Sequence, residues 1–120
     1  MSFTKLSVSA LAIAAMSATV ASAQNREEIR VVGSSTVFPY SQAAAEQFGN
    51  ISDFPAPIVE STGTGGGMQI FCGGIGEAHA DLTGASRAMK ASEYELCAQN
   101  GVTDITEVQI GSDGLSIAVS

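Results

Sequence analysis

The sequence predicts an α/β fold with a mainly parallel sheet and flanking helices, and three observations support that prediction. Short β-type runs alternate with helical segments from residue 29 to residue 101. Such alternation requires crossover connections, which join parallel strands. Turns rich in Ser, Thr or Gly follow the β-type runs, as expected where strands lead into helices. The chain has no repeats and no linker long enough to divide it, so we expect a single folded unit.

The first half of the predicted order is strand, helix, strand, helix. A β-type run at Ile29–Gly33 leads into a helix through residues 34–49. Ser and Thr at the start of that helix suit an N-cap, and Gly49 at its end suits a C-cap. A loop with two prolines separates it from a second β-type run at 58–62. We expect a glycine-rich turn to follow, with a short helix beginning at Met68.

The second half continues with a strand and a capped helix. A third β-type run covers residues 79–86, and a helix is expected over residues 90–101. Ser92 and Glu95 have the spacing of a capping box at its start. The pair Asn100–Gly101 is typical of a helix end.

Two further β-type runs, at 105–111 and 114–120, complete the predicted order. The last run is apolar, and no polar tail or helix follows to cover it. We therefore expect residues 24–120 to be the N-terminal part of a larger protein, truncated at the C-terminus.

Residues 1–23 have the pattern of a secretory signal peptide. Lys5 gives a positive start, residues 6–20 carry no charge, and the small residues Ala21–Ala23 suit signal peptidase. We expect cleavage between Ala23 and Gln24, with no membrane insertion afterwards. A transmembrane anchor is the alternative, but the apolar run is short and lacks a basic flank at its end.

The charge of the chain argues against some classes of partner. Its net charge is −7, and loss of Lys5 with the leader makes the remainder more acidic by one unit. Nucleic acids and anionic membranes are bound through basic patches, so neither is an expected partner. A small anion is still compatible, because aligned backbone N–H groups can hold one locally.

The two cysteines, Cys72 and Cys97, are expected to form a disulfide, because an even pair in an exported protein favours one. A metal site is not expected. There is no C-x-x-C motif, and His79 is the only histidine in the chain.

Three loops between a strand and a helix offer groups that bind anions. They are residues 33–39, rich in hydroxyls, residues 61–71, rich in glycine, and residues 83–93, which include Arg87. Each has a plain alternative: ordinary capping, a turn or linker, and a surface salt bridge from Arg87 to Glu93 or Glu95. Three such loops at equivalent positions of an α/β sheet together predict one anion site.

With these loops, the sequence resembles the phosphate-binding proteins of Pst-type ABC transporters. These are type II periplasmic binding proteins (PBP-like), in which two α/β lobes close on phosphate. The resemblance runs from Ile29 to Ser120 and implies that the chain is an N-terminal part of such a protein, with the second lobe missing. The motifs that carry it are VVGSSTVFP, STGTGGGMQIF, ADLTGASRAMKASE and GSDGLSIAVS. The placement of the cysteines and the ASR-MK form resemble the subgroup with cyanobacterial-type binding proteins.

The resemblance implies a set of ligand residues from the three loops. The implied phosphate-binding residues are Ser35, Thr36, Val37, Phe38, Thr64, Gly65, Ser86 and Arg87. Val37 stands where the family has a Thr, so its contribution is a backbone N–H. Thr62 is an alternative to Thr64, because the glycines permit two alignments. Arg87 stands where many members have an Asp that accepts a proton of phosphate.

The function implied is the capture of inorganic phosphate in the periplasm and its delivery to an inner-membrane permease. We expect a monomer with no enzymatic activity, no catalytic residues and no cofactor. Sulfate or another tetrahedral oxyanion is an alternative ligand, because Arg87 cannot reject a fully deprotonated anion. An exported phosphatase-like enzyme is a second alternative, with His79 as its only histidine base. A structural secreted domain would leave the three loops unexplained.

Overall fold

A computed structural model describes residues 28–119, so the predicted signal peptide lies outside the described residues. Its centre is a three-stranded parallel sheet with the order β2-β1-β3. The strands are β1 (Arg30–Gly33), β2 (Ile58–Ser61) and β3 (Leu82–Gly84). The α/β class and the parallel sheet are confirmed, with each strand shorter than the predicted run.

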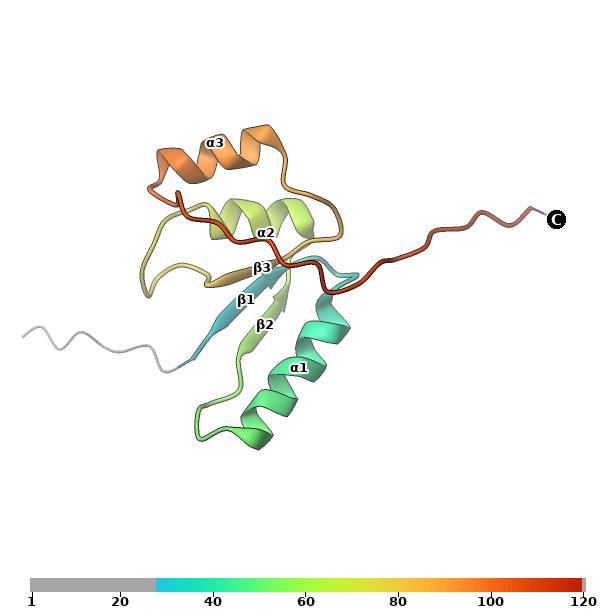
Figure 1. Ribbon diagram of the computed structural model, residues 1–120, viewed down its shortest axis with the longest axis horizontal. Helices are drawn as coiled ribbons and strands as arrows, with labels where there is room; N and C mark the ends of the chain where they lie inside the picture. Colours follow the sequence, from blue (N-terminus) through green and yellow to red (C-terminus); the bar gives the residue numbers. More distant parts are fainter. Residues whose placement is uncertain (1–27, 120) are drawn as a thin grey trace, which may run out of the picture.

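Three helices flank the sheet: α1 (Phe38–Ile51), α2 (Thr64–Phe71) and α3 (Ala91–Gln99). Helix α1 contacts β2, whereas α2 contacts β1, β3 and α3. Figure 1 shows α1 on one side of the strands and α2 on the other, with α3 beyond α2. Helix α2 therefore forms the middle layer between the sheet and α3.

The buried core is small and centres on α2. Its largest fully buried side chains are Val32 of β1 and the two cysteines, Cys72 and Cys97. Met68 of α2 is 3% exposed and belongs to the same buried core. The position of α2 thus determines most of the packing in the described residues.

Helix α1 ends later than the sequence predicts. It continues through Gly49 to Ile51, so the assignment of Gly49 as the C-cap is wrong. Gly49 lies instead against the returning loop. A Cβ atom at this position would be 2.8 Å from the Cβ of Ala56. The glycine is therefore explained by this close approach rather than by the end of the helix.

Helix α2 begins earlier than predicted, at Thr64 rather than Met68, and takes in three consecutive glycines. The preceding Gly63 has φ +73°, a conformation that a side chain disfavours. Gly67 lies directly on the sheet, where a Cβ would be 2.7 Å from the Thr83 hydroxyl and would collide with Gly33. Glycine has low helix propensity, but this contact with the sheet requires it, so packing overrides propensity.

The N-cap of helix α3 lies two residues before the predicted one, Ser92. It is Lys90, and Glu93 at the third helical position accepts the Lys90 N–H at 2.8 Å. The assignment of the capping box to Ser92 and Glu95 is wrong. A glutamate at the third helical position does accept the N–H of the N-cap residue, as a capping box predicts, but the two residues are Glu93 and Lys90. The predicted end is confirmed: Asn100 is the C-cap, and Gly101, with φ +81°, follows it.

Residues 102–119 contain no strand or helix, so the predicted strands at 105–111 and 114–119 are wrong within the described residues. A strand is stable only when its backbone is paired, and no described strand pairs with this segment. Figure 1 shows the end of this segment extending away from the sheet. The side chains of Leu115 and Val119 are 95% and 91% exposed, in contrast to the buried strand that the sequence suggests.

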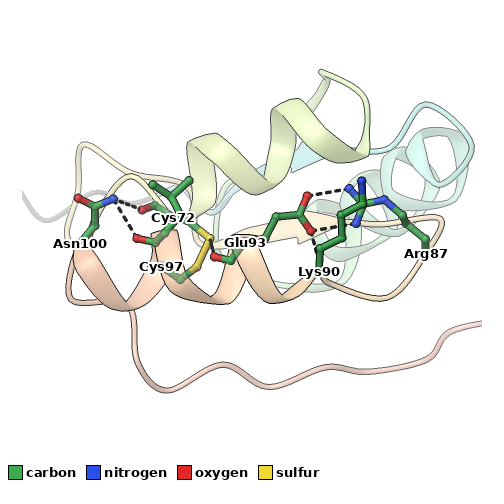
Figure 2. Close-up of a disulfide and its surroundings, with 7 residues drawn as sticks. Cys72, Arg87, Lys90, Glu93, Cys97 and Asn100 are labelled. Carbon is green, nitrogen blue, oxygen red and sulfur yellow. Dashed lines mark hydrogen bonds and ion pairs between the residues drawn. A yellow bond between two sulfur atoms is a disulfide. The ribbon is translucent and has the colours of Figure 1, made fainter.

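The predicted disulfide between Cys72 and Cys97 is confirmed. It joins the residue that ends α2 to the last turns of α3, as Figure 2 shows. Asn100 reinforces this junction, because its side-chain amide donates to the carbonyls of Cys72 (2.8 Å) and Leu96 (3.1 Å). The two helices are therefore fixed to each other at this end.

No helix in residues 28–119 is both long enough and apolar enough to cross a membrane.

Replacement of Gly67 by Ala should destabilise the full-length protein by about 1–3 kcal/mol, because the added methyl group overpacks the contact between α2 and the sheet. Gly66→Ala is the matched control in the same helix, where a Cβ would meet only ordinary contacts, the nearest at 3.6 Å. It should leave stability unchanged or raise it by up to about 1 kcal/mol. Urea unfolding of both variants measures the difference. Equal effects would contradict the close contact.

Loss of the disulfide should cost about 3 kcal/mol, because the bridge closes a loop with a sequence separation of 25 residues and restricts the unfolded chain. Urea unfolding of the full-length protein with and without a reductant measures this cost. The Cys72→Ser/Cys97→Ser variant is the control and should be as unstable as the reduced protein and insensitive to the reductant.

Candidate anion-binding site

The carboxyl ends of the strands place the three predicted loops next to one another. Gly33 at the end of β1 lies opposite Ser61 of β2 and Gly84 of β3. The Thr62 N–H donates to the Gly33 carbonyl, and the Ser34 N–H donates to the Gly84 carbonyl, both at 2.9 Å. The loops are thus hydrogen-bonded to the neighbouring strands where they leave the sheet, and all three begin at one edge.

The first loop is a tight turn built on Ser34, which is buried. The Ser34 carbonyl accepts the Phe38 N–H at 2.9 Å, and its hydroxyl accepts the Thr36 N–H at 3.2 Å. The predicted Phe38 N–H donor is therefore directed into the turn. Ser35 and Thr36 have exposed side chains whose hydroxyls make no hydrogen bond within residues 28–119. These hydroxyls and the Val37 N–H are the groups in this loop that can reach an anion.

The second loop provides the N-terminal end of α2. The N–H groups of Thr64, Gly65 and Gly66 lie in the first helical turn, where no intrahelical carbonyl can accept them. They share a helix end with partial positive charge, which favours a nearby anion. Gly65 has open space at its Cα, since an added Cβ would meet nothing within 4 Å. A ligand can therefore approach the backbone closely at this position.

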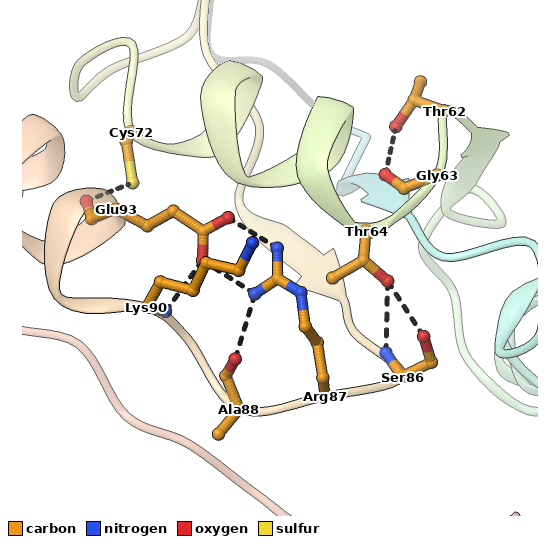
Figure 3. Close-up of polar contacts among 9 residues, drawn as sticks. All are labelled: Thr62, Gly63, Thr64, Cys72, Ser86, Arg87, Ala88, Lys90 and Glu93. Carbon is orange, nitrogen blue, oxygen red and sulfur yellow. Dashed lines mark hydrogen bonds and ion pairs between the residues drawn. The ribbon is translucent and has the colours of Figure 1, made fainter.

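The two threonines of the second loop have different surroundings, which Figure 3 shows. The Thr64 hydroxyl oxygen lies 3.1 Å from the Ser86 hydroxyl and accepts the Ser86 N–H at 3.2 Å. The Thr62 hydroxyl makes one long contact, to the Gly63 carbonyl at 3.4 Å. Thr64 therefore joins the second loop to the third, and Thr62 does not.

In the third loop, Arg87 is paired with Glu93. The two outer nitrogens of its guanidinium donate to the two Glu93 carboxylate oxygens at 2.9 and 2.7 Å, and one of them also donates to the Ala88 carbonyl at 3.0 Å. Figure 3 shows the guanidinium directed toward Glu93, whereas Ser86 is directed toward Thr64. One partner proposed for a salt bridge, Glu93, is confirmed. Three of the five N–H groups of the guanidinium are occupied.

The ion pair keeps both of its members charged over the neutral range. Hydrogen bonds from Arg87, and then from the Lys90 N–H, lower the pKa of Glu93 to about 2. The hydrogen bond to Glu93 raises the pKa of Arg87. The pair has no net charge, so the attraction for an anion must come mainly from hydroxyls, backbone N–H groups and the end of α2.

His79 lies far from these donors. It follows the opposite end of α2, where its N–H donates to the Gly76 carbonyl at 3.0 Å, and its ring lies close to Gly74. The eight residues of α2 rise by about 12 Å between that end and Thr64. Within residues 28–119, no group of three or more His, Cys, Asp or Glu residues has the arrangement of a metal site.

Two residues of the site region were not singled out as functional by the sequence analysis. Ser34 organises the first turn from a buried position, and Glu93 holds Arg87. Ser34 and Ser35 are adjacent in the sequence, and the sequence analysis assigned phosphate binding only to Ser35. Glu93 was considered only as a salt-bridge partner, because the predicted capping box assigned the start of α3 to other residues.

Comparison with known proteins supports the likeness to binding proteins. The family model described as "PBP superfamily domain" matches residues 18–120. Protein SphX of Synechococcus elongatus is 40% identical over 100 residues, which cover 83% of this chain and 28% of that protein. Protein SphX of Synechocystis sp. is 34% identical over 94 residues, which cover 78% of this chain and 26% of that protein. The chain thus spans about a quarter of the length of these curated relatives.

A solved structure has a similar fold. It is the crystal structure of "a possible phosphate binding protein" from Planctomyces limnophilus, with a TM-score of 0.55 and 42% sequence identity. The match covers 62% of this chain and 25% of that protein.

Ionised Glu93 should stabilise the fold in a pH window set by its lowered pKa. Its ordinary pKa is 4.5, and that in the folded protein is about 2. Its contribution should therefore be complete above about pH 4.5 and should disappear as the pH falls through about 2. Urea unfolding of the full-length protein and of Glu93→Gln over this range measures the effect.

The stability difference between the wild type and Glu93→Gln should narrow as the solution becomes more acidic. Glu95→Gln removes the same charge from the same helix and serves as the control. A difference that does not change with pH would contradict the assignment of the acid-sensitive contact to Glu93.

Proposed function

Because the chain belongs to the PBP superfamily, we propose that it captures inorganic phosphate in the periplasm and delivers it to the inner-membrane permease of an ABC transporter. The observation that carries this proposal is the junction of Thr64 with Ser86, which brings donors from separate loops to one sheet edge. The related structure from Planctomyces limnophilus supports phosphate as the ligand. The pattern of residues 1–23 supports export with cleavage after Ala23.

Binding in this proposal relies on neutral donors. An anion leaving water loses its hydration, and fixed N–H and O–H groups must replace it. The hydroxyls of Ser35, Thr36 and Ser86 and the first N–H groups of α2 can do so from one side. In the two-lobed architecture that the resemblance implies, a second lobe supplies donors from the other side. Closure of the two lobes then excludes water, which strengthens each hydrogen bond.

The preference for phosphate over sulfate needs a hydrogen-bond acceptor for a proton on the ligand. Phosphate near neutral pH keeps at least one proton, whereas sulfate has none. The Glu93 carboxylate is occupied by Arg87 and by the Lys90 N–H, so it does not serve as that acceptor. We propose that a hydroxyl oxygen, such as that of Ser86, or a group in the second lobe accepts the proton.

We propose binding without catalysis and a monomeric protein. A phosphatase would need a base beside its nucleophile, and His79 lies at the far end of α2 from Thr64 and Ser86. Turnover of a chromogenic phosphate ester that is lost in Ser35→Ala would instead support the enzyme.

Isothermal titration of the full-length protein with phosphate and with sulfate tests the proposal. Phosphate should bind and sulfate should bind weakly or not at all. Thr64→Val should weaken phosphate binding by roughly tenfold or more, because it removes a hydroxyl that positions Ser86 beside a charged ligand. Thr62→Val is the matched control and should bind as the wild type does. Heat from sulfate alone would exclude phosphate as the ligand.

A further inference from the structure

Glu93 is held more tightly than the other acidic side chains for which contacts are described near the site. Its carboxylate accepts two hydrogen bonds from Arg87 and one from the Lys90 N–H at 2.8 Å. Its side chain is 13% exposed, against 34% for Arg87. A carboxylate with little access to water and three charge-assisted or backbone donors has a fixed position. The guanidinium that it binds is fixed with it.

The segment between β3 and α3 is shaped by this pair. Arg87 donates to Glu93 and, through one of the same nitrogens, to the neighbouring Ala88 carbonyl. Ser86 immediately precedes Arg87, and its N–H and hydroxyl meet the Thr64 hydroxyl. The direction of the chain at Arg87 therefore determines whether Ser86 can reach Thr64.

The other end of α3 is fixed to α2 by independent contacts. The Cys72–Cys97 disulfide and the Asn100 amide join the end of α2 to the last turns of α3, as Figure 2 shows. Helix α3 is thus fixed to the end of α2 opposite Thr64. Glu93 lies in the first turn of α3, so its hydrogen bonds to Arg87 fix the third loop relative to α3.

We propose that Glu93 is a positioning residue of the anion site: it keeps Arg87 from binding the anion directly and, through Arg87, holds Ser86 against Thr64. That the anion is phosphate rests on the proposed function, whereas the effect of Glu93 on the position of Ser86 does not.

A direct role for Arg87 would require a large rearrangement. Counting contacts within residues 28–119, two N–H groups of its guanidinium remain, that on Nε and one on an outer nitrogen. To bind an anion through both outer nitrogens of its guanidinium, Arg87 would have to break its hydrogen bonds with Glu93. The Glu93 carboxylate would then remain largely enclosed, with the Lys90 N–H as its one described donor, which is unfavourable. If Arg87 instead positions Ser86 through the third loop, its pairing with Glu93 stays intact.

Phosphate titration of the full-length protein with Glu93→Gln gives opposite results for the two roles. If Glu93 positions the loop, the variant should bind phosphate roughly tenfold more weakly, because Ser86 is no longer held. If Arg87 is itself the anion ligand and Glu93 competes for it, removal of the negative charge should strengthen binding. Stronger or unchanged binding would overturn the proposal. Glu95→Gln, on the same helix, is the control and should bind as the wild type does.

A double-variant cycle tests whether Arg87 acts through Glu93. Arg87→Gln and the combined Arg87→Gln/Glu93→Gln variant should bind phosphate equally, because either change already breaks the pair. Arg87→Lys should also bind more weakly than the wild type, since lysine keeps the charge but cannot pair with both oxygens. If the double variant lost phosphate affinity by the product of the two single-variant factors, the result would contradict the proposal.

Amide hydrogen exchange at Ser86 without ligand tests the positioning independently of phosphate. Its N–H donates to Thr64, so Glu93→Gln should accelerate its exchange, and Glu95→Gln should not. If the wild type gives no heat with phosphate or sulfate, the proposed function fails, but the exchange rates still decide the role of Glu93. Unchanged exchange at Ser86 in Glu93→Gln would overturn the positioning role.

Discussion

Helix α2 lies on the sheet with no side chain at Gly67 to hold it away, and the other features of the lobe depend on this close approach. The contact of Gly67 with Gly33 and Thr83 sets the height of the helix above the strands. That height lets Met68 fill the core and brings Thr64 to the sheet edge, where it meets Ser86. A larger residue at position 67 would change all of these distances together, because interiors transmit strain rather than absorb it.

The sequence predicted the features that have local or covalent causes. The alternation of strands and helices, the Cys72–Cys97 bridge and the Asn100–Gly101 helix end all appear in the structure. The meeting of the three loops also followed from the sequence, because parallel strands end at one edge.

The remaining features depend on partners that are distant in the sequence. Three glycines at the start of α2 are poor helix formers, and the close contact with Gly33 explains the glycine at position 67. Glu93 rather than Glu95 serves the first turn of α3 because it also binds Arg87. The apolar alternation at the end of the chain resembles a strand, but a strand forms only where another strand pairs with it.

The disulfide has a consequence for the place where the site is completed. In the exported protein that we propose, Cys72 and Cys97 would be joined only after export, because thiols are kept reduced in the cytosol. Before that, α3 would be attached to α2 only through contacts such as that of Asn100 with the Cys72 carbonyl. The covalent attachment of α3 to α2 is thus a property of the oxidised protein. A reduced precursor would carry the same residues without this covalent attachment.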